Sequence, residues 1–329
     1  MSTPEHFQRI DGRVDLQRLG ECTLAVVGVG AVGSQIAEQA ARSGVGNLLL
    51  VDGDTLEAPN VARHVLGADA IGENKAAAVA ARLAAAIPSL HVAYVPRYIT
   101  DDVPDEDMRE LLASADLVVV ATDDRNVQRR IGRVALEADL PAVFPGVDAD
   151  GARGEVFVAL GPHTPCFDCW DLFRTADTPL RAVTALNIDT YATVDVAVRV
   201  VLGVLDPRSQ FADLMRGTAD DPRPRTIFFV AGPGREAGIF STGRSIRRGV
   251  PDFRPNCPVC SRFRPVPARA GRPDPPFPTR QPITTGSARW WLLAPLALFI
   301  LGLAVPSGLV WALAAIAGTG AIAMAVRGQ

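Results

Sequence analysis

The residues of this chain that could do chemistry fall into two groups, which are cysteine pairs and a glycine-rich loop followed by charged residues. Four of the five cysteines form two C-x-x-C pairs, and thiolates with this spacing are typical ligands of a structural zinc site. A redox-active pair is the alternative, but two pairs in a chain without a secretory signal favour metal. The predicted Zn²⁺ ligands are Cys166, Cys169, Cys257 and Cys260.

The glycine-rich loop has the pattern G-x-G-x-x-G, with its glycines at Gly28, Gly30 and Gly33. Glycine permits a tight turn and a close approach of the backbone to phosphate, and the start of the following helix offers free N–H groups. Asp52 ends the next apolar run, where a carboxylate can accept hydrogen bonds from ribose hydroxyls. The pattern by itself fits NAD, FAD or ATP, and a purely structural turn is also consistent with it.

Lys75 is the only lysine among the 33 basic residues of the chain. Its ammonium is a compact, rotatable point charge, which a planar guanidinium is not. The alternative interpretation is that one surface lysine survived by chance. Its position downstream of the glycine-rich loop favours a role at a nucleotide. The formal net charge of −3 gives no overall basic field, so nothing in the composition indicates a nucleic-acid partner.

Strand-like apolar runs alternate with helix-like segments in the first half of the chain, which predicts a parallel sheet with helices on both faces. The expected strands are 22–28, 47–52, 91–95, 116–121 and 141–147, and the expected helices are 32–43, 74–87 and 126–139. Strands at 155–159 and 226–231 and a helix at 189–205 are expected further on. The predicted fold class is α/β, with a doubly wound, Rossmann-like, mostly parallel sheet.

Two uncharged apolar runs, 290–305 and 309–326, stand near the C-terminus on either side of a Pro-Ser-Gly turn. One helix of that length would measure about 55 Å, against about 30 Å for the core of a bilayer, so two membrane passes fit better. A re-entrant first run and a buried soluble hairpin are the alternatives. Arginines flank the runs and are absent from the turn, so the positive-inside rule predicts a membrane anchor with the catalytic domain in the cytoplasm.

Several motifs together resemble the ThiF/MoeB/HesA family, the adenylating domain shared with ubiquitin-activating E1 enzymes. They are the run SGVGNLLLVDGD, the N-x-x-R pair Asn60 and Arg63, the G-x-x-K step at Lys75, the A-T-D strand end at Asp123 and both C-x-x-C pairs. The resemblance covers roughly residues 5 to 261. It implies ATP and Mg²⁺ as cofactors and a homodimer as the assembly.

The resemblance also implies roles for individual residues. Asn60, Arg63 and Lys75 would contact the triphosphate, Asp123 would hold Mg²⁺, and Arg9 would be lent to the ATP of a partner subunit. Arg63 and Lys75 would neutralise phosphate oxygens as a carboxylate attacks. Alternatively, Arg63 and Asp123 form a surface ion pair and Asn60 a turn. The complete predicted cofactor-binding set is Gly28, Gly30, Ala31, Gly33, Asp52, Asp54, Asn60, Arg63, Lys75, Asp123 and Asp124.

The chain departs from the family pattern at three places. Many relatives carry a cysteine that takes the activated acyl group in the crossover loop after the first C-x-x-C, and residues 170–183 here contain none. Cys22, at the start of the first expected strand, is most simply a core residue. Ala31 replaces a glycine that is common in the loop, and His64 stands where a glutamine is frequent.

These observations predict three parts, which are an adenylating domain at 1–261, a Pro/Arg-rich linker at 262–288 and a transmembrane hairpin at 289–329. The expected reaction is ATP-dependent adenylation of the C-terminal carboxylate of a ubiquitin-like or sulfur-carrier protein, or of a peptide. The chain would release pyrophosphate and use no catalytic cysteine of its own. The alternatives are an NAD-dependent oxidoreductase and a non-catalytic membrane-anchored scaffold.

Overall fold

The computed structural model describes residues 4–100, 102–147, 153–171, 186–231, 245–249 and 256–263. The α-helices are α1 (Leu16–Glu21), α2 (Ala31–Arg42), α3 (Lys75–Ala86), α4 (Asp105–Leu112), α5 (Arg125–Glu137), α6 (Phe167–Asp171) and α7 (Asn187–Leu205). The strands are β1 (Thr23–Val27), β2 (Asn47–Val51), β3 (His91–Val95), β4 (Leu117–Val120), β5 (Ala142–Val147), β6 (Arg153–Ala159), β7 (Ile227–Ala231) and β8 (Ser245–Gly249). Short 3₁₀ helices are η1 (Glu5–Ile10), η2 (Ala58–Asn60), η3 (Ala68–Ala70), η4 (Gly161–His163), η5 (Gln210–Leu214) and η6 (Ser261–Phe263).

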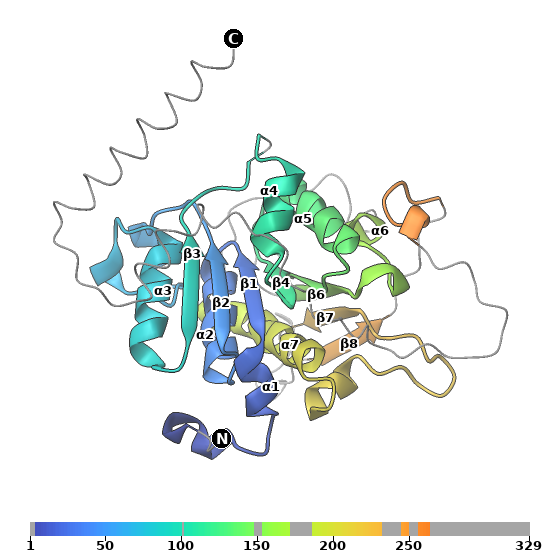
Figure 1. Cartoon of the computed structure of the whole chain (residues 1–329), viewed down its shortest axis with the longest axis horizontal. Coiled ribbons are helices and arrows are strands. Elements are labelled where there is room, and N and C mark those ends of the chain that lie inside the picture. Colours follow the sequence, from blue (N-terminus) through green and yellow to red (C-terminus); the bar gives the residue numbers. More distant parts are fainter. Residues whose placement is uncertain are drawn as a thin grey trace, which may run out of the picture. The chain divides into compact units, whose positions relative to one another are not determined.

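The eight strands of the described residues form one sheet with the order β3-β2-β1-β4-β5-β6-β7-β8 (Figure 1). The ladders from β3 across to β5 are parallel, and those from β5 to β8 are antiparallel. In a parallel sheet the carboxyl ends of neighbouring strands share one edge, and ligands of open α/β sheets bind there. The loops that follow β1, β2 and β4 therefore lie at a common edge.

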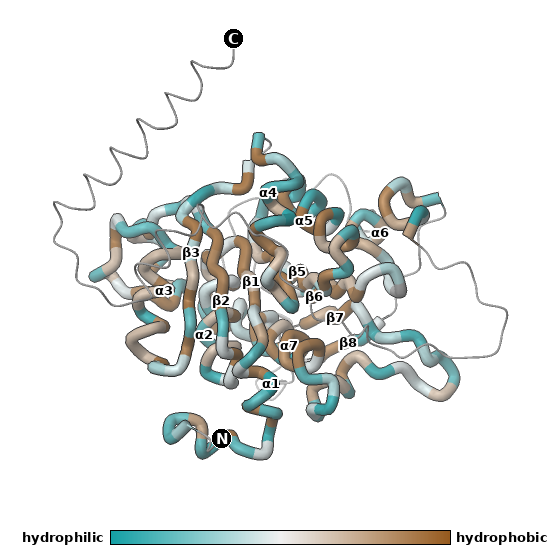
Figure 2. The backbone as a smooth tube through the Cα atoms, viewed as in Figure 1, coloured by the Kyte–Doolittle hydropathy of each residue, from teal (hydrophilic) through white to brown (hydrophobic). Residues whose placement is uncertain are grey.

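Alternating residues of the central strands pack on opposite faces of the sheet. Leu24 and Val26 of β1 belong to the buried cluster that holds α2, α3 and α7, whereas Ala25 and Val27 belong to the cluster that holds α4 and α5. Both sets are almost fully buried, and these strands are hydrophobic along their length (Figure 2). This pattern is typical of a strand covered on both faces, and it confirms the predicted two-sided arrangement of helices.

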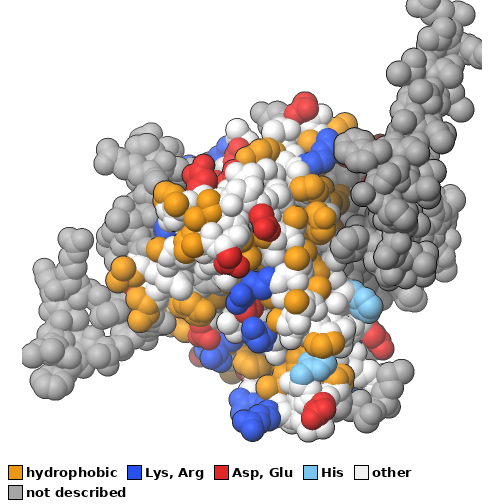
Figure 3. All heavy atoms as spheres, turned by 90° about the vertical axis from the view of Figure 1, so that its left-hand side faces the viewer, with side chains coloured by type: hydrophobic (Ala, Val, Ile, Leu, Met, Phe, Trp, Pro, Cys, Tyr) orange, Lys and Arg blue, Asp and Glu red, His pale blue; other side chains and the backbone are white. Residues whose placement is uncertain are grey.

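The outer strand β3 ends the sheet beside α3. Its residues are half-buried or exposed, unlike those of β1. On this side of the molecule, hydrophobic side chains are interspersed with charged side chains of both signs (Figure 3).

The structure differs from the expected elements mainly in short segments. The helices α1, α4 and α6 and the strand β8 were not predicted, because a few residues carry too little periodicity to identify an element. Within the described residues, no helix is both long and apolar enough to span a bilayer. The predicted hairpin at 289–329 lies outside the described residues, as do residues 264–288 of the predicted linker.

Candidate functional site

The three glycines of the glycine-rich loop are required for different steric reasons. Gly28 has φ +86°, and a Cβ there would lie 2.7 Å from the backbone nitrogen of Thr122, which follows β4. A Cβ on Gly33 would lie 1.9 Å from the carbonyl oxygen of Gly28. A Cβ on Gly30 would meet nothing within 4 Å. Two glycines therefore close the loop against β4, and the third faces open space in which a ligand could lie.

The N-terminus of α2 follows this loop directly. Gly30 is the N-cap residue and Ala31 the first residue of the helix, and no side chain caps the end. The first N–H groups of an α-helix have no partner within the helix, and their dipoles make the end positive. This end of α2 can therefore accept an anion such as phosphate.

Asp52, the residue after β2, is held in a fixed orientation by two backbone donors. One carboxylate oxygen accepts the N–H of Val29 at 2.6 Å, and the other accepts the N–H of Asp54 at 2.8 Å. Each oxygen keeps a further lone pair. The side chain is thus anchored next to the glycine-rich loop and retains capacity to accept hydrogen bonds from a ribose.

Lys75 opens α3 and is only 8 % exposed. Its ammonium nitrogen lies 2.8 Å from a carboxylate oxygen of Asp54, and the hydroxyl of Tyr98 donates to the other oxygen at 2.7 Å. These hydrogen bonds, that from Lys75 first, lower the pKa of Asp54 below its ordinary value. Two predicted cofactor-binding residues, Lys75 and Asp54, are therefore paired with each other.

Asn60 ends η2, and Arg63 lies on the turn that follows it. The side-chain oxygen of Asn60 accepts the N–H of Glu57 at 3.1 Å, and its carbonyl accepts the N–H of Arg63 at 2.9 Å. The carbonyl of Arg63 in turn accepts a hydrogen bond from Gln35 of α2 at 2.9 Å. Asn60 therefore shapes this turn, and Gln35 holds the turn against α2.

His64 connects the same turn to the glycine-rich loop. Its Nε2 lies 2.7 Å from the carbonyl oxygen of Val29, and its Nδ1 accepts the N–H of Leu66 at 3.2 Å. Because Nδ1 is an acceptor, the ring is neutral and carries its proton on Nε2. Burial lowers the pKa of His64, which is only 8 % exposed. The only signal of this contact in the sequence was a histidine beside Arg63.

Asp123 and Asp124 follow β4 and have different surroundings. The carboxylate of Asp124 caps α5 by accepting the N–H groups of Asn126 at 2.8 Å and Val127 at 3.2 Å. Asp123 is exposed and forms no hydrogen bond or ion pair within the described part of the chain. Both capping bonds of Asp124 use the same carboxylate oxygen, whereas both carboxylate oxygens of Asp123 are available to a cation.

Arg9, in η1, lies at the opposite edge of the sheet. His6 in the same short helix approaches the hydroxyl of Ser89 at 2.9 Å, and Ser89 lies just before the amino end of β3. The glycine-rich loop follows the carboxyl end of β1. Within one chain, the fold thus does not bring Arg9 to the other predicted residues.

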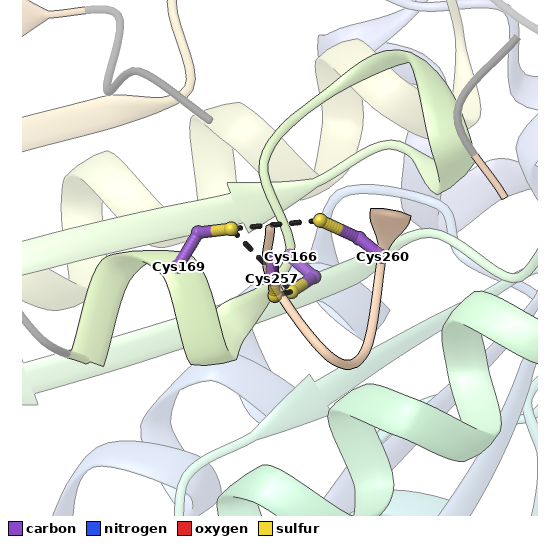
Figure 4. Close-up of side chains that lie close together, drawn as sticks. All are labelled: Cys166, Cys169, Cys257 and Cys260. Atoms are coloured by element: carbon purple, nitrogen blue, oxygen red, sulfur yellow. Dashed lines mark hydrogen bonds between the residues drawn. The ribbon is translucent and has the colours of Figure 1, made fainter. Parts of the chain in front are cut away.

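The four paired cysteines form a compact buried cluster (Figure 4). Cys166 and Cys169 lie at α6, Cys257 and Cys260 lie on a separate loop, and all four sulfur atoms lie within 4.8 Å of one another. The sulfur atoms of Cys166 and Cys257 are 3.7 Å apart, and those of Cys169 and Cys260 are 3.5 Å apart. Four thiolates around one zinc ion, at about 2.3 Å each, stand about 3.8 Å apart, so the cluster fits Zn²⁺.

Two ion pairs link the segments that carry the cysteine cluster to α5. Arg133 of α5 contacts Asp168, between the first two cysteines, at 2.9 Å, and Arg262 contacts Glu137 of α5 at 2.7 Å. The cluster therefore joins two segments that are far apart in sequence to one helix. The remaining cysteine, Cys22, is 9 % exposed, and burial raises its pKa to about 11.

Comparison with protein families gives a match over almost the whole chain. The ThiF family model matches residues 4–321. The chain belongs to the ThiF family. The loops after β1, β2 and β4 and the segments that carry Asn60, Arg63 and Lys75 are linked around the glycine-rich loop.

Curated relatives match this ThiF-family chain over part of their length. Ubiquitin-like modifier-activating enzyme 5 of Arabidopsis thaliana is 28 % identical over 175 residues, which are 50 % of this chain and 41 % of the relative. The tRNA threonylcarbamoyladenosine dehydratase of Bacillus subtilis is 34 % identical over 134 residues, which are 40 % of this chain and 51 % of the relative. The chain thus spans about half or less of the length of these relatives.

Among solved structures, the ThiF-family fold is shared with E. coli MccB. The two superpose with a TM-score of 0.60 at 17 % identity, over 79 % of this chain and 73 % of MccB. MccB has also been solved with ATP, and with AMPCPP together with MccA. At this identity the similarity establishes the fold alone.

Proposed function

We propose that this chain is an adenylyltransferase that activates the C-terminal carboxylate of a ubiquitin-like or sulfur-carrier protein, or of a peptide. One carboxylate oxygen would attack the α-phosphorus of ATP, the bond from that phosphorus to the bridging oxygen would break, and pyrophosphate would leave. The products would be an acyl-adenylate and pyrophosphate.

The observation that carries this proposal is how the predicted residues are linked around one loop. Val29 is hydrogen-bonded to Asp52 and to His64, the neighbour of Arg63, and Gly28 packs on the backbone that leads to Asp123. Lys75 is connected through Asp54, whose N–H is bound by Asp52. The segments that carry the two cations, the uncapped end of α2 and the exposed carboxylate of Asp123 are thus connected to the same glycine-rich loop.

The described groups would have separate roles in this reaction. Arg63 and Lys75 would neutralise the charge that develops on phosphate oxygens, and a fixed cradle would position the reacting atoms. Carboxylate oxygen is a suitable ligand for Mg²⁺, and Asp123 is the residue that would hold it. When bound, Mg²⁺ would stabilise the charge of the leaving pyrophosphate.

Transfer of the acyl group onto a cysteine of this chain is not part of the proposal. Four cysteines form the buried cluster, and Cys22 is buried with a raised pKa, which keeps its thiol protonated and unreactive. The acyl-adenylate would instead pass to an external nucleophile such as a sulfur donor, an amine or a cysteine of a partner.

The similarities support the choice of substrates. MccB, which shares the fold, was solved with ATP and with MccA, and relatives of the chain are named ubiquitin-like modifier-activating enzymes. The residues of the site disfavour the NAD-dependent alternative. An NAD-dependent oxidoreductase would leave Lys75, Asp123 and the cysteine cluster without a role. Attachment to a membrane and assembly as a homodimer remain predictions, to be checked by membrane fractionation and light scattering.

The test is binding of Mg·ATP and of NAD by calorimetry, followed by ATP–pyrophosphate exchange with candidate carrier proteins and peptides. We expect binding of Mg·ATP and no binding of NAD. Lys75→Ala should lower exchange by about 10²-fold or more, because a charge on the transferring phosphate is lost. Arg82→Ala, on the exposed side of the same helix, is the matched control and should stay within about twofold. Unchanged exchange in Lys75→Ala would show that the site is wrongly assigned.

A further inference from the structure

We propose that His64 is a positioning residue that turns the N–H of Gly30 toward the phosphates of the nucleotide. The proposal rests on the proposed function, because it needs a nucleotide at the glycine-rich loop. It concerns a residue at which this chain departs from the glutamine that is frequent in the family.

Val29 is held at both of its backbone polar groups. Its N–H donates to Asp52 at 2.6 Å, and its carbonyl oxygen accepts the Nε2–H of His64 at 2.7 Å. Its side chain is fully buried. The contact with Asp52 fixes the plane of the preceding peptide, whereas the Val29 carbonyl belongs to the peptide between Val29 and Gly30, so its contact with His64 fixes that plane.

The direction of the Gly30 N–H follows from that plane. A trans peptide is planar, so its N–H points opposite to its C=O. The structure contains no cis peptide bond among the described residues. Because His64 binds the Val29 carbonyl, the Gly30 N–H must point away from His64. This N–H forms no hydrogen bond within the described part of the chain, and a Cβ on Gly30 would meet open space.

The same ring also fixes the turn that carries Arg63. The backbone N–H of His64 donates to the carbonyl of Asn60 at 3.0 Å, and the ring Nδ1 accepts the N–H of Leu66 at 3.2 Å. The imidazole therefore sets the distance between the Arg63 turn and the glycine-rich loop. Two parts of a phosphate site, a backbone donor and a cation, are thus positioned by one side chain.

This arrangement requires the neutral ring. Protonation would place a hydrogen on Nδ1, which would then face the N–H of Leu66, so the imidazolium cannot keep both contacts. The charged groups that act on His64 are Lys75, which opposes its protonation, and Asp52, which favours it. Burial lowers the pKa of His64, so the neutral form persists at neutral pH and the contacts weaken as pH falls below the ordinary range of histidine.

The test compares two variants, each of which preserves one of the two hydrogen bonds that the imidazole ring makes. His64→Gln can place an amide N–H near the position of Nε2 and donate to Val29, whereas His64→Asn can replace only the acceptor near Leu66. The dissociation constant of Mg·ATP is measured by calorimetry from pH 8 to pH 5, and folding is checked by urea unfolding without nucleotide. We expect His64→Gln to bind within about threefold of wild type at pH 8 and His64→Asn to bind at least about tenfold more weakly.

The pH series gives a second readout. The titration of ATP itself is common to all variants, so the ratio of wild-type affinity to His64→Gln affinity isolates His64. That ratio should become smaller as the pH is lowered, because protonation removes contacts only in wild type. Equal binding of Mg·ATP by wild type and His64→Asn, or a ratio that does not change with pH, would overturn the role of His64. Failure of wild type to bind Mg·ATP would instead overturn the proposed function.

Discussion

The cysteine cluster and the edge of the sheet around the glycine-rich loop differ in how completely their functional groups are buried and brought together. The four thiol groups are buried and lie within 4.8 Å of one another. At the loop, Asp123 is exposed, and the ammonium of Lys75 is paired with Asp54. The cysteine cluster is closed by the protein itself. At the loop, Asp123 is available to a ligand, and Lys75 must be released from Asp54 before it can bind one.

This difference fits the roles that we propose for the two sites. Four protein ligands complete the tetrahedral shell of zinc, so a buried and rigid site contributes to folding. A site that binds and releases a nucleotide must stay open to solvent and keep its cations from repelling one another while it is empty. The predictions below test this contrast, starting with the largest expected effect.

Replacing a cysteine of the buried cluster should destabilise the whole domain. We expect Cys169→Ser to lose most of its zinc and to lower the free energy of unfolding by more than about 4 kcal/mol, because loss of a structural metal removes folding energy directly. Elemental analysis and urea unfolding measure the two effects. Cys22→Ala is the matched control and should keep its zinc at a cost of about 1 kcal/mol. Full stability of Cys169→Ser would mean that the cluster is not a structural metal site.

The two aspartates after β4 should separate function from stability. Asp123→Ala should lower ATP–pyrophosphate exchange by about 10²-fold, because the proposed Mg²⁺ ligand is lost, and should leave the free energy of unfolding within about 0.5 kcal/mol. Asp124→Ala should lower that free energy by about 1 kcal/mol, because it removes the cap of α5. Exchange assays and denaturant unfolding of both variants give the result. The reverse pattern would exchange the roles that we assign to the two residues.

Removing the partner of Lys75 should have the smallest effect. We expect Asp54→Asn to change the free energy of unfolding by less than about 1 kcal/mol, since the pair is partly exposed, and to bind Mg·ATP a few-fold more tightly because the ammonium is released. Tyr98→Phe keeps the ion pair and is the control. Weaker binding by Asp54→Asn would show that Asp54 positions Lys75 rather than competing for it.

This pair also has a defined pH dependence. The pKa of Asp54 is lowered in the folded protein, so the pair contributes stability above the ordinary pKa of aspartate. That contribution is lost as pH falls through the lowered value. The difference in stability between wild type and Asp54→Asn should therefore disappear in strong acid.

Patterns confined to a short stretch of sequence predicted much of the fold. The strand at His91–Val95 was predicted with its observed bounds, and the helices α2 and α3 begin and end within two residues of their expected positions. The glycine-rich loop could be recognised because the steric need for Gly28 and Gly33 arises from a turn that always joins a strand to a helix. Two C-x-x-C pairs likewise predicted the cysteine cluster.

The sequence therefore determined the alternation of strands and helices, the loop and the donor set of the cluster, because hydrophobic period, glycine and cysteine spacing are local properties. Only the tertiary structure decided that Lys75 is paired with Asp54 and that His64 binds Val29. Asp54 and Lys75 are 21 residues apart, and His64 and Val29 are 35 apart. Such partners are chosen when strands align in the sheet and bring their following loops together, which no local pattern encodes.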